Sequence, residues 1–271
     1  MTLRSGFGKY GIAVQKPGAA PLLQPNEYSG LTLWLRADNV SGATWTNNSN
    51  AGSAGNYTLA NSPTVNSSDS NFNGQASITF NGSNQSADGP TNANTWLGTD
   101  GEYFAYVVFR NHGTYHDGPY HDHLIGVPGN YLSVGFAFNQ VYDTQYRNNN
   151  VGAGAADTTY VMECGLANQG NMGSVSANFF GNQSAWTGNK QFANLCAVGS
   201  NTGSASGTAY DIAATAYGAQ KSGVAGFNGG QYYDGEVAEV ILYNSVPSAW
   251  LARTLSVRAY LNNRYGTFTY A

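Results

Sequence analysis

The stretch that most constrains the fold is residues 235–266, GEVAEVILYNSVPSAWLARTLSVRAYLNNRYG. Its first part, residues 236–244, is apolar on both faces when it is read as a strand, because successive strand residues point to opposite sides. A strand of this kind needs cover on both faces. The rest of a sheet can cover one face, and the residues that follow predict a helix that covers the other.

That helix is predicted over residues 247–265. Pro247 suits the first turn of a helix, and Ser248 can accept hydrogen bonds from first-turn amides as an N-cap. Gly266 follows the last periodic residue, where a left-handed glycine ends many helices. The expected apolar stripe consists of Trp250, Val257 and Leu261, with Leu251 and Leu255 beside them.

Further short apolar or alternating runs predict strands, separated by turns rich in Gly and Asn. Many short strands of this kind favour a β-sandwich, and 271 residues are an ordinary length for one large β domain. Residues 39–72 are expected to be loop-rich, with short strands at best. The expected strands are 31–38, 77–80, 102–110, 124–127, 131–139, 142–146, 160–166, 175–180, 195–199 and 210–216.

Three blocks resemble one known family. The last block matches G-x-[VI]-A-E-[VI]-[IVL]-[LVI]-Y followed by a helix ending in Y-L-x-x-[RK]-Y-G, the first is LTLWLRAD at residues 31–38, and the second includes Trp45, Pro63 and NGQASITFNG at residues 73–82. Together they resemble laminin-G-like, concanavalin A-like lectin/glucanase domains, which occur in phage virion and bacterial surface proteins. The resemblance implies an all-β, concanavalin A-like jelly-roll sandwich with one C-terminal helix. Its motifs specify the fold rather than a catalytic site.

The N-terminal residues differ from the rest in composition. Residues 1–27 are rich in Gly and Pro and contain Arg4, Lys9 and Lys16 before the first acid, Glu27. This composition predicts an extended arm ahead of a domain at residues 28–271. We expect the arm to anchor the domain to an acidic surface on another virion protein; the alternative is that it lies along its own domain.

Charge and hydropathy exclude several classes of protein. The net charge of −4 gives no electrostatic footprint for nucleic-acid binding. No apolar run is long enough to span a bilayer, and the first residues lack the apolar segment of a signal peptide. We therefore expect assembly into a virus particle in the host cytoplasm, with a cytoplasmic lectin or a protein exported by another route as alternatives.

The two cysteines, Cys164 and Cys196, both fall in expected strands. Two buried free thiols are the first interpretation, as is usual for a protein made in a reducing compartment. A disulfide that forms after release is the alternative, and it requires the two strands to be neighbours.

All four histidines lie in one expected loop, NHGTYHDGPYHDHL, at residues 111–124. Imidazole and carboxylate ligands suit a divalent transition metal, but the spacing matches no fixed zinc motif. A polar, pH-sensitive loop is therefore the first interpretation, and a metal site is the alternative. The resemblance also suggests Ca²⁺, although few acids are available to hold it. The candidate metal ligands are His116, Asp117, His121 and His123.

Three acids gather near the start of the last strand. Asp234, Glu236 and Glu239 resemble the E-x-D-x-x-E arrangement of glucanases, but strict alternation places Glu239 on the face opposite to the other two. We predict acids at a strand edge plus a buried ion pair of Glu239, because a buried carboxylate needs a partner. The resemblance implies that the opening strand pairs with this last strand, which makes Arg36 the expected partner. No nucleophile elbow or nucleotide-binding loop is present, so we expect no enzymatic activity.

The resemblance implies carbohydrate binding by aromatic residues in loops, although any one of these can equally be structural. The predicted function is a non-enzymatic surface protein of a tailed-phage virion, in head decoration or in the tail or fibre, that contacts neighbouring proteins or host glycans and can form homo-oligomers. A free carbohydrate-binding lectin is the alternative, and a glucanase the third. The candidate sugar contacts are Trp96, Tyr115, Tyr120, Trp186 and Tyr232.

Overall fold

The computed structural model describes residues 23–49, 55–90, 103–112, 122–127, 132–137, 140–143, 157–168, 192–198, 201–203, 223–224, 232–245 and 250–268. Within these ranges every strand pairing is antiparallel, and one α-helix follows the last strand. The predicted all-β sandwich with a C-terminal helix is confirmed. The expected arm falls almost entirely outside these ranges, and its division from residues 28–271 stays a prediction.

The elements, in chain order, are η1 (Pro25–Glu27), β1 (Leu31–Ser41), β2 (Thr44–Asn47), β3 (Tyr57–Ala60), β4 (Thr64–Asp69), η3 (Ser70–Phe72), β5 (Gln75–Asn81), β6 (Ser86–Asp88), β7 (Tyr103–Asn111), β8 (Asp122–Val127), β9 (Leu132–Ala137), β10 (Gln140–Asp143), β11 (Thr159–Asn168), β12 (Phe192–Val198), β13 (Asn201–Gly203), β14 (Gly223–Val224), β15 (Asp234–Tyr243) and α2 (Trp250–Tyr265).

Strand β15 is the centre of the sheet. It pairs with β7 along one edge, whereas its other edge is divided between two strands. The N-terminal half pairs with β5 and the C-terminal half with β1. From β15 the strand order runs one way through β7, β11, β12 and β13, and the other way through β1, β2, β3, β6, β14, β8, β9 and β10. The divided edge lets two parts of the sheet leave β15 in different directions, as a sandwich requires.

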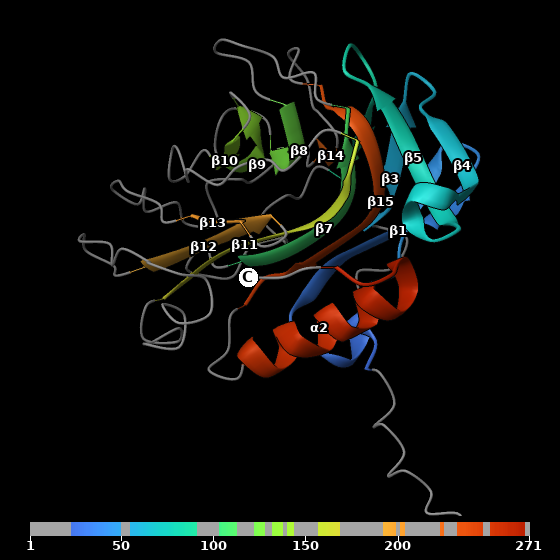
Figure 1. Ribbon diagram of the computed structural model, residues 1–271. Helices are drawn as coiled ribbons and strands as arrows, with labels where there is room; N and C mark the ends of the chain where they lie inside the picture. The colour runs from blue at the N-terminus through green and yellow to red at the C-terminus, as the bar shows by residue number, and fades with distance from the viewer. Residues whose placement is uncertain are drawn as a thin grey trace, which may run out of the picture.

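Helix α2 covers one face of β15 and its neighbours, while β8, β9 and β10 lie on the opposite side of the β7–β11 layer (Figure 1). Every residue of β15 after Asp234 is buried, as the two-sided apolar pattern predicts. The cluster between the helix and the sheet includes Trp34, Phe104, Tyr106, Ile241, Tyr243, Val257, Tyr260, Leu261 and Tyr265.

The buried face of α2 is more polar than expected. Val257 and Leu261 are buried as predicted, but Leu255 is 52% exposed and is not part of the stripe. The buried positions at helical spacing also include Arg253, Thr254 and Arg258. Within the described part of the chain, no helix is long and apolar enough to cross a membrane.

Most strand predictions agree with the structure to within a few residues, at β1, β5, β7–β12 and β15. The region expected to be loop-rich also contains β2, β3 and β4. Strand β4, TVNSSD, is mostly exposed and polar, so it lacks the apolar alternation by which strands are found. The expected strands at 175–180 and 210–216 lie outside the described residues.

Candidate functional site

A β-bulge brings the three acids of β15 to one face of the sheet. The pairing of β15 with β7 shifts between Val237 and Glu239, so that Glu236 lies opposite Arg110 and Glu239 lies opposite Val108. Arg110 and Val108 are alternate residues of β7 and therefore share a face. The prediction that Glu239 points away from Glu236 is wrong, because the bulge adds one residue and reverses the alternation.

Arg110 pairs with two acids, Glu236 near the start of β15 and Asp157. Its Nη1 donates to both carboxylate oxygens of Glu236, at 3.0 and 2.9 Å. Its Nη2 lies 2.9 Å from Oδ1 of Asp157, and its Nε donates to the carbonyl oxygen of the same residue. A guanidinium bound to a carboxylate through two oxygens, or to two acids at once, has a well-defined orientation.

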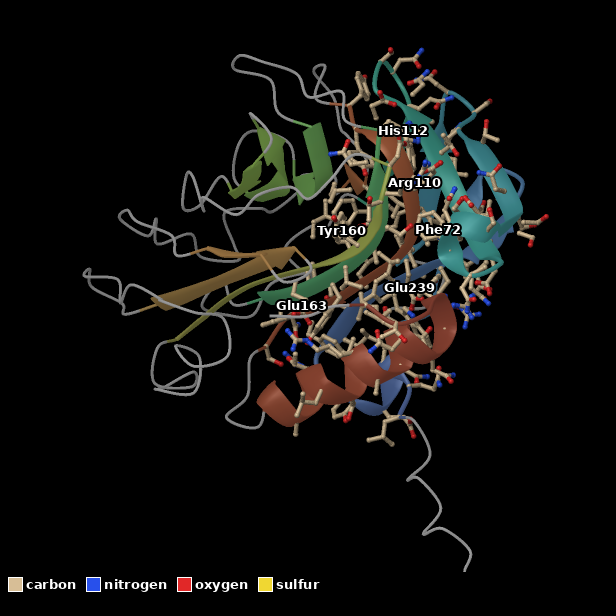
Figure 2. The ribbon with its side chains drawn as sticks, in the orientation of Figure 1. Phe72, Arg110, His112, Tyr160, Glu163 and Glu239 are labelled. Carbon is tan, nitrogen blue, oxygen red and sulfur yellow. The ribbon has the colours of Figure 1, made fainter. Side chains whose placement is uncertain are left out.

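His112 lies between Asp234 and Glu236, two of the three acids of β15. Its Nδ1 is 3.2 Å from Oδ1 of Asp234, and its Nε2 is 3.2 Å from Oε1 of Glu236. The backbone amide of His112 donates to the carbonyl oxygen of Asp234, which fixes the end of β7 against the start of β15. We call Arg110, His112, Asp157, Asp234 and Glu236 the open cluster; Figure 2 shows its Arg110 and His112 at the end of the sheet away from α2.

The open cluster is partly accessible to solvent. The side chains of His112 and Asp234 are 28% and 23% exposed, and that of Glu236 is 10% exposed. Gly235, between the two acids, is required by close packing, since a Cβ atom there would lie 2.3 Å from the carbonyl oxygen of Arg110. The backbone of β15 therefore passes close to β7 at the point where the charged side chains meet.

Glu239 lies beyond the bulge in a different environment. It is 0% exposed. Its Oε1 accepts hydrogen bonds from Trp34 Nε1 at 2.6 Å and from the Tyr260 hydroxyl at 2.9 Å. Its Oε2 accepts from the Tyr265 hydroxyl at 2.7 Å and lies 3.6 Å from Arg264 Nε. We call Glu239, Trp34, Tyr260, Arg264 and Tyr265 the buried cluster.

Burial controls the ionisation of the buried cluster. Removal from water raises the pKa of Glu239, against the opposing effect of the hydrogen bonds from Tyr265 and Trp34 and of the Arg264 charge. Burial, and then the nearby Glu239 charge, raises the pKa of Tyr265 well above its ordinary value. The three donors therefore remain protonated and hold the carboxyl group between the sheet and the helix.

The predicted ion pair between Arg36 and Glu239 is not the one that forms. The two residues are directly opposite in the register of β1 and β15, as expected. However, Arg36 Nε lies 3.1 Å from Oδ1 of Asp38, and its guanidinium lies over the Trp34 ring. The carboxylate oxygens of Glu239 instead accept hydrogen bonds from Trp34, Tyr260 and Tyr265. The cation near these oxygens is Arg264, which lies at the end of α2.

A second buried acid joins the helix to the sheet. Glu163 of β11 accepts a hydrogen bond at 2.7 Å from Nε of Arg258 and pairs with Nη2 of the same arginine. Figure 2 shows Glu163 on the side of the sheet that faces α2. Burial raises the pKa of Glu163, against the effect of Arg258. This pair and the buried cluster account for Arg258 and Arg264 of α2, whereas Arg253 donates to the Ser245 carbonyl oxygen and lies over the Tyr243 ring.

Few of the predicted site residues fall in the described part of the chain. Tyr232 is partly buried, two residues before Asp234, and His123 lies in β8 opposite Gly135 of β9. Among the described residues, no group of three or more His, Cys, Asp or Glu side chains is arranged to hold a metal. The predicted residues outside the described ranges are Arg4, Lys9, Lys16, Trp96, Tyr115, His116, Asp117, Tyr120, His121 and Trp186.

The structure joins two features that are separate in the sequence. The histidine-rich segment begins at His112, and His112 contacts the acids of β15. Arg110 and Asp157 were not predicted as site residues. Arg110 could have been proposed from the sequence, because it is a cation at the end of an otherwise apolar strand. Nothing in the sequence connects Asp157 with β15.

No protein-family model matches this chain, and no curated protein matches it. Solved structures do match. One is domain 4 of an extracellular arabinanase of glycoside hydrolase family 43 from Geobacillus stearothermophilus, in complex with arabinotriose; it is 9% identical with a TM-score of 0.52, over 82% of this chain and 96% of that one. Another is a Trypanosoma rangeli sialidase with 2,3-difluorosialic acid, 14% identical with a TM-score of 0.50, over 86% of this chain and 33% of that one.

At these identities the likeness shows the fold, and this chain spans about a third of the sialidase. The prediction that the protein is not an enzyme is corrected by the comparison, because the solved structures that share its fold are parts of glycoside hydrolases. The fold is thus one that occurs in proteins that act on or bind carbohydrate.

Proposed function

We propose that this protein is a lectin-like carbohydrate-binding domain and that the open cluster is its sugar-contacting surface. The observation that carries the proposal is the group formed by His112, Asp234 and Glu236 at the ends of two central strands, in which His112 and Asp234 are partly exposed and Glu236 is nearly buried. The comparison with the arabinanase domain supports it, because that domain has the same fold over nearly its whole length and was solved with an oligosaccharide.

The chemistry of the open cluster suits hydroxyl groups. Carboxylate oxygens accept hydrogen bonds from sugar hydroxyls, and a hydrogen bond to a charged group contributes about 1.5–3 kcal/mol. The contacts with Arg110 and His112 hold the two carboxylates in place before a ligand arrives, which lowers the entropy cost of binding. Tyr232, two residues away in sequence, is the predicted aromatic contact nearest to the cluster along the chain.

A glycan panel tests this proposal. The full chain is applied to immobilised glycans that include arabinotriose, sialylated oligosaccharides and bacterial lipopolysaccharide, and the best ligand is then titrated calorimetrically. We expect Asp234→Asn to lower the affinity about tenfold, the equivalent of one charged hydrogen bond. Asp38→Asn is the matched control, because Asp38 is also a partly exposed, ion-paired acid but lies at Arg264. Binding to no glycan, or equal losses in both variants, would overturn the proposal.

Glycoside hydrolysis is the second function that we propose to test, because Asp234 and Glu236 share one face and flank His112. Glycosidases use two carboxylates placed on either side of the scissile bond. The measurement is the release of reducing ends from any glycan that the panel identifies. Activity that Glu236→Gln abolishes, while binding persists, would favour a glycosidase; binding without release would leave the lectin.

The finer proposal is that the domain is displayed on a tailed-phage virion through its basic N-terminal residues. The resemblance of residues 235–266 and the composition of residues 1–27 support it. In the described structure the Tyr243 hydroxyl donates to the Pro25 carbonyl oxygen at 2.8 Å. Deletion of residues 1–22 keeps this contact. Sedimentation of the full chain with intact particles, and of the deletion variant at the top of the gradient, is the expected result; both at the top would contradict it.

A further inference from the structure

The two cysteines of the chain lie opposite one another on neighbouring strands. Cys164 is in β11 and Cys196 is in β12, and the register pairs them directly. That register runs without a shift from Met162 opposite Val198 to Asn168 opposite Phe192. The chain has only these two cysteines, so a single intramolecular disulfide is the one that it can form.

We propose that Cys164 and Cys196 form a cross-strand disulfide. Directly opposed residues of an antiparallel pair have Cα atoms about 4.5–5.5 Å apart, and disulfides bridge Cα atoms about 4.4–6.8 Å apart. Opposed residues also share a face of the sheet. The backbone of β11 and β12 therefore meets the distance requirement of a disulfide without a change of register.

The disulfide would act at one end of the strand order. β12 has β11 on one side and the three-residue β13 on the other, so its pairing with β11 is its main attachment. A covalent link at Cys164 would hold this pairing and close the intervening residues 165–195 into a loop. That loop contains Trp186, one of the predicted sugar contacts, and the disulfide would tie the two ends of the segment together.

The oxidant in this proposal is a low-molecular-weight disulfide such as oxidised glutathione. One cysteine thiolate attacks a sulfur of the small disulfide, which forms a mixed disulfide and releases one small thiolate. The second cysteine thiolate attacks the protein sulfur of the mixed disulfide and releases the second small thiolate. The protein loses two protons and two electrons, and one small disulfide is reduced to two thiols.

Peptide mapping tests the link directly. The full chain is purified in reductant, exchanged into oxidised glutathione, alkylated with iodoacetamide and digested with trypsin. Cleavage after Arg147, Lys190 and Lys221 separates the two cysteines into peptides 148–190 and 191–221. We expect these peptides to remain joined until reductant is added, with neither cysteine alkylated. Alkylated cysteines, stable glutathione adducts or links between chains would overturn the proposal.

A variant in which the second cysteine is moved by one position tests whether the disulfide depends on the pairing of β11 with β12. Cys196→Ala combined with Ala197→Cys places the second cysteine opposite Glu163 and on the other face of the sheet. We expect this variant to collect glutathione adducts instead of an internal disulfide; internal closure at the wild-type rate would contradict the assignment. Reductant should also lower the melting temperature of the oxidised wild type and leave that of Cys196→Ser unchanged.

Discussion

The open cluster and the buried cluster use carboxylates of the same strand, and Glu236 and Glu239 are separated by Val237 and the bulged residue Ala238. At Glu239 the helix covers the carboxyl group, and four side chains surround it. At Glu236 and Asp234 the partners Arg110 and His112 come from β7. The glutamate side chain is the same in both places, whereas its exposure and its partners differ.

This difference separates a structural acid from the acids that we propose as sugar contacts. Glu239 is inaccessible to ligands, and its hydrogen bonds join β1, β15 and α2. In the open cluster Asp234 is partly exposed, and Glu236 is nearly buried beside it. The following variants test this distinction, beginning with the largest expected effect.

Removal of the buried carboxylate should have the largest effect. Glu239→Ala leaves Trp34, Tyr260 and Tyr265 without their acceptor and Arg264 without its buried charge partner. Loss of one member of a buried charged pair costs about 3–5 kcal/mol, and we expect the free energy of unfolding to fall by that amount. Urea denaturation followed by tryptophan fluorescence measures it. A loss under about 1 kcal/mol, the range of surface ion pairs, would contradict the structural role.

Removal of the cation of the open cluster should have an intermediate effect. Arg110→Met keeps the apolar stem of the side chain but leaves Glu236 without its two-oxygen partner. A hydrogen bond to a charged group contributes about 1.5–3 kcal/mol, and partial exposure places the expected loss at the lower end. The same denaturation series measures it. A loss of unfolding free energy equal to that of Glu239→Ala would contradict the proposed difference between the two clusters.

The pH dependence of stability should identify the buried carboxyl group. Burial raises the pKa of Glu239 above its ordinary value of 4.5. The stability that this group contributes is therefore complete below pH 4.5 and is lost as the pH rises through the pKa of the folded state. We expect the difference in unfolding free energy between wild type and Glu239→Gln to decrease as the pH rises from 4; an increase would contradict the raised pKa.

The exposed end of the buried network should have the smallest effect. Asp38 pairs with Arg264 at 2.6 Å and with Arg36 at 3.1 Å, and its side chain is 37% exposed. Surface ion pairs contribute about 0–1 kcal/mol, so Asp38→Asn should change stability within that range. Thermal unfolding at low and high salt measures it. A larger loss would show that Arg264 depends on Asp38 for its position at Glu239.

The sequence predicted the fold better than the site. The apolar pattern of β15 and the periodicity of α2 predicted the strand–helix pair, and the family resemblance predicted that Arg36 faces Glu239. The partners of Glu239 were missed because the bulge at Ala238 and the reach of Arg264 from the helix end are tertiary features. The open cluster was missed for a related reason. Its residues lie in β7, in β15 and at Asp157, which come together only when the sheet forms. The periodicity of a single segment does not indicate such a contact.

The most direct test of the distinction measures glycan affinity and unfolding free energy on the same two variants, Asp234→Asn and Glu239→Gln, with the best ligand of the panel. We expect Asp234→Asn to lose about tenfold in affinity with stability changed by no more than about 0.5 kcal/mol. Glu239→Gln should lose stability, while its folded fraction keeps wild-type affinity. Unchanged affinity in Asp234→Asn, or lost affinity in folded Glu239→Gln, would contradict the assignment of binding to the open cluster and of structure to the buried one.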